Sequence, residues 1–281
     1  MTESSPLAGS DSLLRAALRG EASGDPVPTG YPSVDGLLGG GLRRGDLVVL
    51  AGDTAVGKSA LALAIALRVV ATGRSAAYLT GEMSATRVLE RALAMEGRVR
   101  VDDFRRGDLD DVAHAGVATA ALSLRSQSPL IEDLRDSGVS GVSDFLAEHL
   151  GLELTIVDSL QSLAQGRMAL DEEMADAGRR LKELALRRST TILAISGLAS
   201  SPAARADPRP SLVDLGGLGA IRQHADVVMG LYREELYQPG RHVEGAAELS
   251  VLKNRNGPTG FIDLFFYKQW LRFEDMVEPD R

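Results

Sequence analysis

Residues 52–59 constrain the fold of this chain most, because they fit the pattern G-x-x-x-x-G-K-[ST] between an apolar run and an Ala/Leu-rich stretch. Such a loop, between a buried strand and a helix, presents backbone N–H groups that surround phosphates. Lys58 is expected to reach the β and γ phosphates of ATP, and Ser59 to supply a hydroxyl to Mg²⁺. The expected nucleotide-binding residues are Gly52, Asp53, Thr54, Ala55, Val56, Gly57, Lys58 and Ser59.

Apolar, strand-length runs alternate with helix-length amphipathic segments from residue 47 onward, which indicates an α/β fold with a mostly parallel sheet and helices on both faces. The predicted strands are Leu47–Ala51, Ala76–Thr80, Leu130–Glu132, Leu154–Val157, Thr190–Ile195, Val227–Tyr232, Ala247–Leu252 and Phe261–Phe266. The last two are expected to form an antiparallel edge hairpin around Asn256-Gly257-Pro258. Helices are expected after the P-loop and over Thr86–Glu96, Ser140–His149 and Asp171–Arg188.

Two carboxylates follow predicted strands, at the sheet edge where parallel α/β proteins bind ligands. Asp158 follows Leu154–Val157 and is expected to hold the Mg²⁺ shell together with Ser59. Glu82 follows Ala76–Thr80, where a carboxylate can act as general base toward the water that attacks the γ-phosphate. An ordinary helix cap at Asp158 and an ordinary surface glutamate at Glu82 are the alternative interpretations.

Composition excludes several classes of protein. The chain has no cysteine, which excludes disulfides and thiolate metal sites and suits a reducing compartment. A net charge of −8 argues against a protein that coats nucleic acid with its whole surface, but leaves room for a narrow contact strip. With no membrane span and no signal peptide in the sequence, we expect a soluble, cytoplasmic protein that does not bind membranes.

The first 28 residues are rich in Ser, Gly, Pro and Ala and are expected to form a tail before a single domain over residues 29–281. Within the tail, Asp11–Arg19 places leucines on one side of a short helix. A helix of this length is marginal by itself in water, so it either frays or docks on a neighbouring surface.

The order of motifs resembles the C-terminal motor domain of DnaB-type replicative helicases, from about Thr29 to Glu274. The matching residues, beside the P-loop, are Thr29-Gly30-Tyr31, Gly41-Leu42, Gly45-Asp46-Leu47, Gly81-Glu82-Met83, Ile156-Val157-Asp158, Leu160-Gln161, Asp207-Pro208-Arg209-Pro210, Asp214-Leu215, Ala225-Asp226, Tyr232-Arg233 and Lys253-Asn254-Arg255-Asn256-Gly257-Pro258. Several spaced motifs in one order make this resemblance specific.

The resemblance implies a RecA-like P-loop NTPase fold, a hexameric ring, ATP hydrolysis at subunit interfaces and 5′ to 3′ movement on single-stranded DNA. It casts Glu82 as the catalytic base. It also casts Lys253 and Arg255 as a lysine and an arginine finger that reach the neighbouring subunit's site, where cations stabilise the charge of the transition state. The alternative for this pair is a solvated hairpin. The segment Asp11–Arg19 would correspond to the family's linker helix.

The sequence departs from the family pattern in three places. The residues before Thr29 leave no room for the family's N-terminal helical domain, which recruits primase, so we do not expect primase binding. The family's Ser-Gln pair, whose amide senses the γ-phosphate, reads Ser196-Gly197 here. The family's DNA-contacting loop, Asp-Leu-Arg-Glu-Ser-Gly, reads Asp214-Leu215-Gly216-Gly217-Leu218-Gly219.

This loop is still the candidate DNA contact, because backbone N–H groups and nearby arginines can hold phosphates. The candidate residues are Arg205, Arg209, Gly216, Gly217, Gly219 and Arg222. A glycine-rich loop is equally compatible with a mobile connector that binds nothing.

Three functions are compatible with these motifs. The first is a DNA helicase-like ATPase motor that translocates on single-stranded DNA. The second is a RecA-superfamily regulatory ATPase that binds or remodels protein partners without unwinding DNA, and the third is a nucleotide-dependent ring that binds a replicative helicase. A small-molecule kinase would need a lid with clustered arginines and has no use for the Lys253–Arg255 hairpin.

Overall fold

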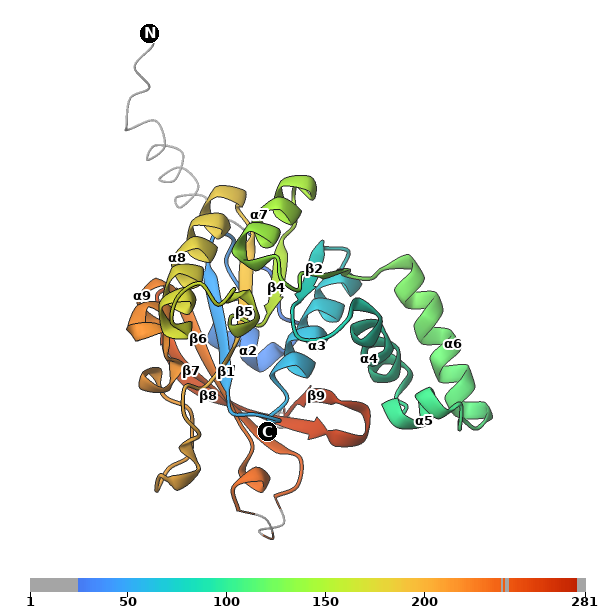
Figure 1. Ribbon diagram of the computed structural model, residues 1–281. Helices are drawn as coiled ribbons and strands as arrows, with labels where there is room; N and C mark the ends of the chain where they lie inside the picture. Colours follow the sequence, from blue (N-terminus) through green and yellow to red (C-terminus); the bar gives the residue numbers. More distant parts are fainter. Residues whose placement is uncertain (1–24, 239, 241–242, 277–281) are drawn as a thin grey trace, which may run out of the picture.

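A computed structural model describes residues 25–238, 240 and 243–276 and places them around one nine-stranded sheet (Figure 1). The strand order is β3-β2-β4-β5-β1-β6-β7-β8-β9. The strands are β1 (Leu47–Gly52), β2 (Ala76–Thr80), β3 (Leu130–Asp133), β4 (Leu154–Asp158), β5 (Thr191–Gly197), β6 (Val227–Tyr232), β7 (Ala246–Asn254), β8 (Gly260–Tyr267) and β9 (Arg272–Asp275).

Strands β1 to β6 run parallel to one another, and β7, β8 and β9 continue the sheet antiparallel. Gly52, at the end of β1, lies opposite Gly197 of β5 and Leu231 of β6. Thr80 of β2 lies opposite Asp158 of β4. The carboxyl ends of the parallel strands therefore meet at one edge, which is where this class of sheet binds ligands.

Helices cover both faces of the sheet, and two apolar cores result. The helices are α2 (Pro32–Leu37), α3 (Lys58–Ala71), α4 (Ala85–Gly97), α5 (Val101–Arg106), α6 (Asp111–Ser126), α7 (Gly138–Glu148), α8 (Leu170–Arg188) and α9 (Ala220–His224). Side chains of α3 and α4 pack with Val48 and Leu50 on one face, whereas those of α7, α8 and α9 pack with Leu47 and Val49 on the other. Because successive residues of β1 point into different cores, the whole strand is buried and reads as an unbroken apolar run.

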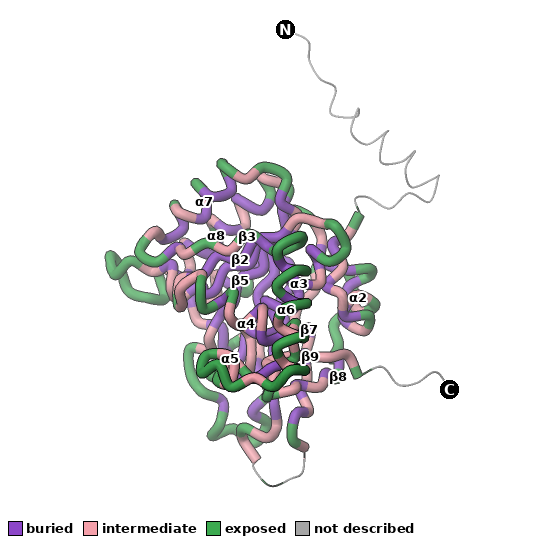
Figure 2. The backbone as a smooth tube through the Cα atoms, turned by 90° about the vertical axis from the view of Figure 1, so that its right-hand side faces the viewer, coloured by how far each residue is buried: buried purple, intermediate pink, exposed green. Residues whose placement is uncertain are grey.

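The predicted fold class is confirmed, and each strand and helix predicted within the described residues is present with ends shifted by at most a few residues. The structure corrects one detail, because β9 pairs with β8 and so the β7–β8 hairpin is not the edge of the sheet. Sequence reasoning also missed α6, which buries only Ala120 and Leu124 and so has no long apolar stripe. Figure 2 shows α5 and α6 largely exposed on the outside of the molecule.

Two further observations concern the sequence expectations. The predicted helix at Asp11–Arg19 lies outside the described residues. Of the helices in the described ranges, none combines the length and the apolar character that crossing a lipid bilayer requires.

Candidate active site

The P-loop connects β1 to α3 at the carboxyl edge of the sheet. Gly57 has φ 106°, and a Cβ there would lie 2.9 Å from the ring of Phe273, so this position requires glycine for two reasons. The Lys58 ammonium donates to the carbonyls of Gly52 (3.0 Å) and Asp53 (2.9 Å). Burial lowers the pKa of Lys58, and the carboxylates of Glu82 and Asp158 partly offset this shift.

Asp158 ends β4 and is almost completely buried. The Tyr78 hydroxyl donates to its Oδ2 at 2.6 Å, whereas its Oδ1 has no hydrogen-bond partner in the structure. Burial raises the pKa of Asp158, and the hydroxyls of Tyr78 and Ser59 partly offset this shift. A buried carboxylate oxygen without a partner, close to the Ser59 hydroxyl, is a donor set that suits Mg²⁺.

No group of three or more His, Asp or Glu side chains able to hold a metal ion occurs in the described residues. A Mg²⁺ ion in a P-loop site needs no such group, because phosphate oxygens and water complete its coordination. The donor set at Ser59 and Asp158 is therefore compatible with the predicted role, which stays a prediction.

Glu82 lies just beyond the end of β2 and is exposed. Its carboxylate accepts a hydrogen bond from the Ser159 hydroxyl at 2.5 Å, which fixes its position relative to the end of β4. Lys58, Ser59, Glu82 and Asp158 line one cavity of about 690 Å³. The structure thus brings together the P-loop and both carboxylates that the sequence singled out.

Arg91 and Gln161 are among the other residues that line this cavity, and sequence reasoning assigned neither of them to it. Arg91 projects from α4 and forms no ion pair with another described residue. The Gln161 amide group donates to the Ser196 hydroxyl and the Gly197 carbonyl, and accepts from the Gly197 N–H, all at 3.3 Å. Arg91 is one of many arginines along α4 and α5, so no sequence signal distinguished it, whereas Gln161 belonged to a recognised motif without a role.

Lys253 and Arg255 lie at the opposite edge of the sheet. Lys253 is paired in register with Val228, near the start of β6, while the P-loop follows the far end of β1. Four residues of strand, or about 13 Å, separate the level of Lys253 from the start of the loop that follows β1. The Lys253 ammonium donates to the Ala225 carbonyl (2.5 Å), and Arg255 forms an ion pair with Asp226 (2.9 Å). The structure therefore does not bring this pair to the P-loop of its own chain.

The candidate DNA loop follows β5. Arg205 forms two hydrogen bonds with the Asp214 carboxylate, at 2.9 and 3.0 Å, and Arg209 forms two with Glu248, both at 3.0 Å. Arg222 is exposed and has no ion pair among the described residues.

Glycines 216, 217 and 219 of this loop all have positive φ, and the exposed Leu218 between them has φ 52°. The N–H of Gly217 donates to Asp171 at 2.8 Å, and that of Gly219 to the Gly216 carbonyl at 3.3 Å. Two of the three glycine amides therefore already have partners inside the protein.

The loops after β5 and β6 are tied to the P-loop through one carboxylate. Asp53 accepts hydrogen bonds from the Ser201 hydroxyl (2.7 Å) and from the Tyr237 hydroxyl (3.1 Å). Burial by itself would raise the pKa of Asp53, but hydrogen bonds from Ser201, Thr54 and Tyr237 lower it below its ordinary value. The P-loop thus has a direct connection to the segment that leads into the candidate DNA loop.

Comparison with known proteins identifies similar chains. A family model for the DnaB-like helicase C terminal domain matches residues 26–275. The replicative DNA helicase DnaB of Geobacillus stearothermophilus is 32% identical over 92% of this chain, and the replicative DNA helicase DnaC of Bacillus subtilis is 31% identical over 92%. In each case the match spans 58% of the relative, so this chain corresponds to less than two thirds of those proteins.

Two solved structures share the fold. The ATPase domain of G40P superposes with a TM-score of 0.87 at 22% identity, covering 98% of this chain and 100% of that one. A DnaB-like replicative helicase, solved to describe its interactions with primase, gives a TM-score of 0.84 at 22% identity, covering 98% and 68%. These likenesses confirm the predicted RecA-like architecture.

Proposed function

The chain belongs to the DnaB-like helicase C-terminal domain family, and on that premise we propose that it is an ATP-hydrolysing motor that moves along single-stranded DNA. One observation carries the proposal. A single cavity gathers a P-loop lysine, a buried carboxylate with an unpaired oxygen and an exposed glutamate, which are the groups that phosphoryl transfer to water requires.

In this mechanism Lys58 leaves the carbonyls of Gly52 and Asp53 and contacts the β and γ phosphates of ATP. Ser59 and Asp158 would hold Mg²⁺, which would supply positive charge to neutralise the phosphate oxygens. Glu82 orients the attacking water and accepts its proton, while the Ser159 hydroxyl keeps the carboxylate in place. Arg91 adds a positive charge to the same cavity, where it stabilises the charge that develops on the γ-phosphate.

The second part of the proposal is a closed ring, with six members as the family resemblance implies. Lys253 and Arg255 lie too far from the P-loop of their own chain to act there. In a head-to-tail ring the far edge of one subunit faces the nucleotide cavity of the next, so these two cations complete the neighbour's site. They would have to exchange their present partners, Ala225 and Asp226, for the γ-phosphate.

The third part concerns DNA. We propose the loop 212–222 as the strand contact, because Arg222 is exposed and forms no ion pair with the described residues, and we expect movement in the 5′ to 3′ direction as in the family. The connection from Asp53 to Ser201 gives a route by which nucleotide binding alters this loop. We propose the cytoplasm as the location of the protein, because DNA is its proposed substrate and a chain without cysteine suits a reducing compartment.

The test is ATP hydrolysis by the purified chain with and without single-stranded DNA, in the wild type and in Lys58→Ala, Glu82→Gln and Arg255→Ala variants. We expect DNA to raise the rate, and each substitution to lower it by about a hundredfold or more. Arg187→Ala, near the end of α8 where the Arg187 side chain is exposed, serves as a control that keeps the rate. An ATP hydrolysis rate that does not change with single-stranded DNA would contradict the proposed motor function and would favour a regulatory ATPase that acts on protein partners.

A further inference from the structure

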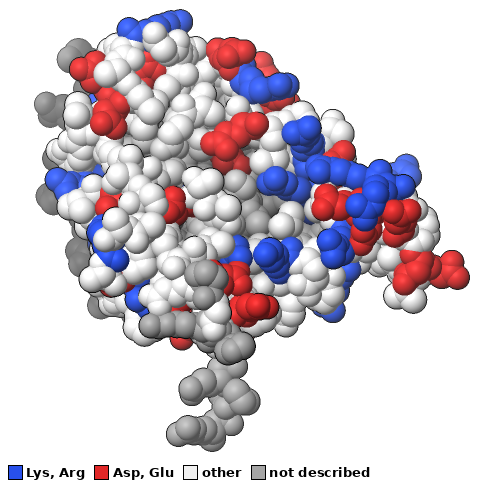
Figure 3. Space-filling model, turned by 60° about the horizontal axis from the view of Figure 1, so that its bottom comes forward, with Lys and Arg blue, Asp and Glu red and all other residues white. Residues whose placement is uncertain are grey.

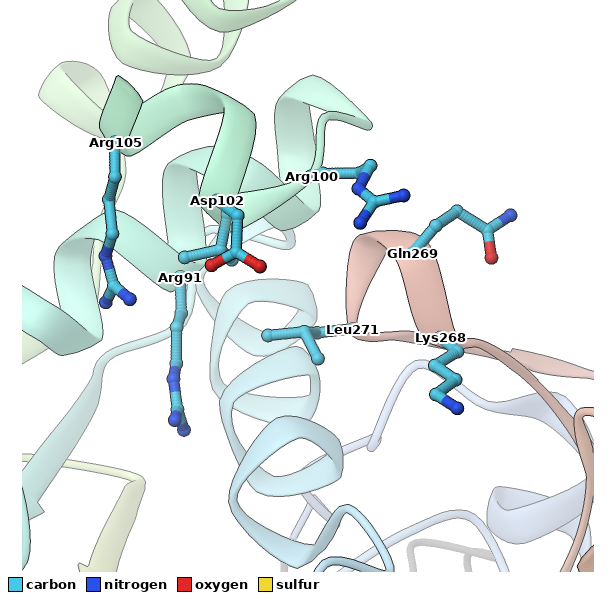
Figure 4. Close-up of a pocket in the computed structure, with 8 residues that line it drawn as sticks. Arg91, Arg100, Asp102, Arg105, Lys268, Gln269 and Leu271 are labelled. Atoms are coloured by element: carbon cyan, nitrogen blue, oxygen red, sulfur yellow. The ribbon is translucent and has the colours of Figure 1, made fainter. Parts of the chain in front are cut away.

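A second cavity, of about 570 Å³, adjoins the proposed nucleotide site between α4, α5 and the turn from β8 to β9 (Figure 4). Its polar lining consists of Arg91, Arg100, Asp102, Arg105, Lys268 and Gln269. Figure 4 shows Arg100 reaching across toward Gln269, and Arg91 and Arg105 pointing the same way from their two helices. The volume falls in the range of small-molecule sites.

The charge of this cavity is predominantly positive. Four cations line it against the single carboxylate of Asp102. Arg105 is neutralised by Glu90 at 2.8 Å, whereas Arg100 approaches Asp103 only at 3.5 Å. Neither Arg91 nor Lys268 has an ion pair in the part of the chain that the structure describes.

The cation excess is confined to the cavity. On the side of the molecule that carries α4, α5 and α6, Figure 3 shows Lys and Arg side chains interspersed with Asp and Glu side chains. The chain as a whole has a net charge of −8, so a local excess of cations runs against its composition. A cation excess concentrated at a cavity favours an anionic ligand there.

The shape and chemistry of the lining narrow the ligand class. Guanidinium groups bind phosphate oxygens through paired N–H donors, and three of the four cations are arginines. Val101 and Leu271 add apolar surface, and Gln269 adds an amide, which suits an organic group attached to the phosphate. We propose that this cavity binds a phosphorylated small molecule of nucleotide size, separately from the ATP at the P-loop.

The two cavities share part of their lining. Arg91, Lys268 and Leu271 line both of them. When the Arg91 guanidinium binds a phosphate in the second cavity, it no longer contacts a phosphate in the first. Each ligand therefore lowers the affinity for the other, and by the same factor. This coupling rests on the proposed use of ATP at the P-loop, whereas binding in the second cavity does not.

Binding is tested with inorganic tripolyphosphate and GDP as probes, by calorimetry on a Lys58→Ala variant whose P-loop no longer grips phosphate. We expect this variant to retain a binding site, and a further Arg100→Gln substitution to weaken it at least tenfold. Arg100 is the suitable position because its side chain is 63% exposed and makes only a long ion pair, so the fold does not depend on it. Arg98→Gln, an exposed arginine of the same segment outside the cavity lining, should leave the affinity unchanged.

Coupling is tested by ATP hydrolysis in the presence of tripolyphosphate. In the wild type the probe should raise the KM for ATP, and Arg100→Gln should remove at least half of that increase while leaving hydrolysis without the probe unchanged. Equal inhibition and equal affinity in the Arg100→Gln and Arg98→Gln variants would overturn the proposal. So would loss of single-stranded DNA binding, in place of tripolyphosphate binding, upon Arg100→Gln. Because calorimetry needs no hydrolysis, an inactive ATPase would count only against the proposed function.

Discussion

At the scale of single residues, Asp158 shows a conflict between stability and function. Burial holds the pKa of this carboxyl above its ordinary value. The folded protein therefore binds the proton more tightly than the unfolded chain, so the contribution of Asp158 to stability is present at low pH and is lost as the pH rises through its folded-state pKa. Under the proposed function, the role of the charged carboxylate is to hold Mg²⁺.

Asp158→Asn, which resembles the protonated side chain, is accordingly expected to raise the melting temperature by a few degrees at pH 8 without nucleotide. The gain should vanish below about pH 4, where the wild-type carboxyl is protonated as well. Thermal unfolding over this pH range measures the effect, and ATP hydrolysis should be lost in the same variant. Asp133→Asn is the control, because Arg135 lowers the pKa of Asp133 and its removal brings no gain. A variant less stable than the wild type at pH 8 would contradict this account.

The residues of the site differ in how far the sequence predicted them. The expected position of Asp158 and Glu82 at one edge of the sheet agrees with the structure, because each lies at or just beyond the end of a buried parallel strand, whereas their roles stay predictions. Arg91 was not found, since its place in the cavity depends on how α4 packs against the sheet. The contact of Gln161 with Gly197 depends on the pairing of β4 with β5, which no local pattern encodes.

At the scale of elements, β9 supports the P-loop although it is only a short strand. Phe273 is fully buried, its ring centroid lies 4.4 Å from that of Phe266, and it leaves no room for a side chain at Gly57. Phe273→Ala should therefore lower the free energy of unfolding by about 3–5 kcal/mol, as measured by urea denaturation. Phe261→Ala, in the same antiparallel part of the sheet but 63% exposed, should change it by less than about 0.5 kcal/mol. An equal decrease in the free energy of unfolding for both variants would show that the burial of Phe273 does not determine its contribution to stability.

The junction at Asp53 yields a prediction about loops. Tyr237→Phe removes one of the two hydroxyls that hold this carboxylate to the loops after β5 and β6. Because a hydrogen bond to a charged group contributes about 1.5 kcal/mol or more, amide exchange in residues 233–238, which belong to the loop after β6 that carries Tyr237, should accelerate about tenfold. Tyr267→Phe, whose hydroxyl makes no hydrogen bond to another described residue, should leave exchange unchanged. Hydrogen exchange by mass spectrometry makes the comparison, and unchanged rates in Tyr237→Phe would exclude the junction as a restraint.

The sequence predicted the elements whose residues are buried in a regular pattern along the chain. The strands β1, β4 and β6 are buried along their full length and read as apolar runs. Strand β9 was not predicted because it has only four residues, of which Phe273 alone is buried, and it follows a left-handed residue, Leu271. Helix α6 was not predicted because it packs mainly against α4 and most of its surface is exposed to solvent, so it lacks a long apolar stripe.

At the scale of the whole molecule, the two functional groups occupy opposite edges of one sheet. The P-loop cavity is at the carboxyl edge, and Lys253 and Arg255 are at the other. In the ring proposed above, one chain therefore holds two halves of two different sites, and a complete site needs a neighbour. This arrangement makes complementation between inactive variants possible.

Lys58→Ala disables the P-loop but keeps the fingers, whereas Arg255→Ala keeps the P-loop but lacks one finger. Each variant by itself should be nearly inactive. In a random 1:1 mixture of chains that exchange between rings, about a quarter of the interfaces combine an intact P-loop with an intact finger, so about a quarter of the wild-type ATPase rate should return. A mixture of Lys58→Ala with Glu82→Gln is the control, because both changes lie at the P-loop side and no interface combines two intact halves. A mixture of Lys58→Ala and Arg255→Ala that remains inactive after subunit exchange would show that the pair acts elsewhere.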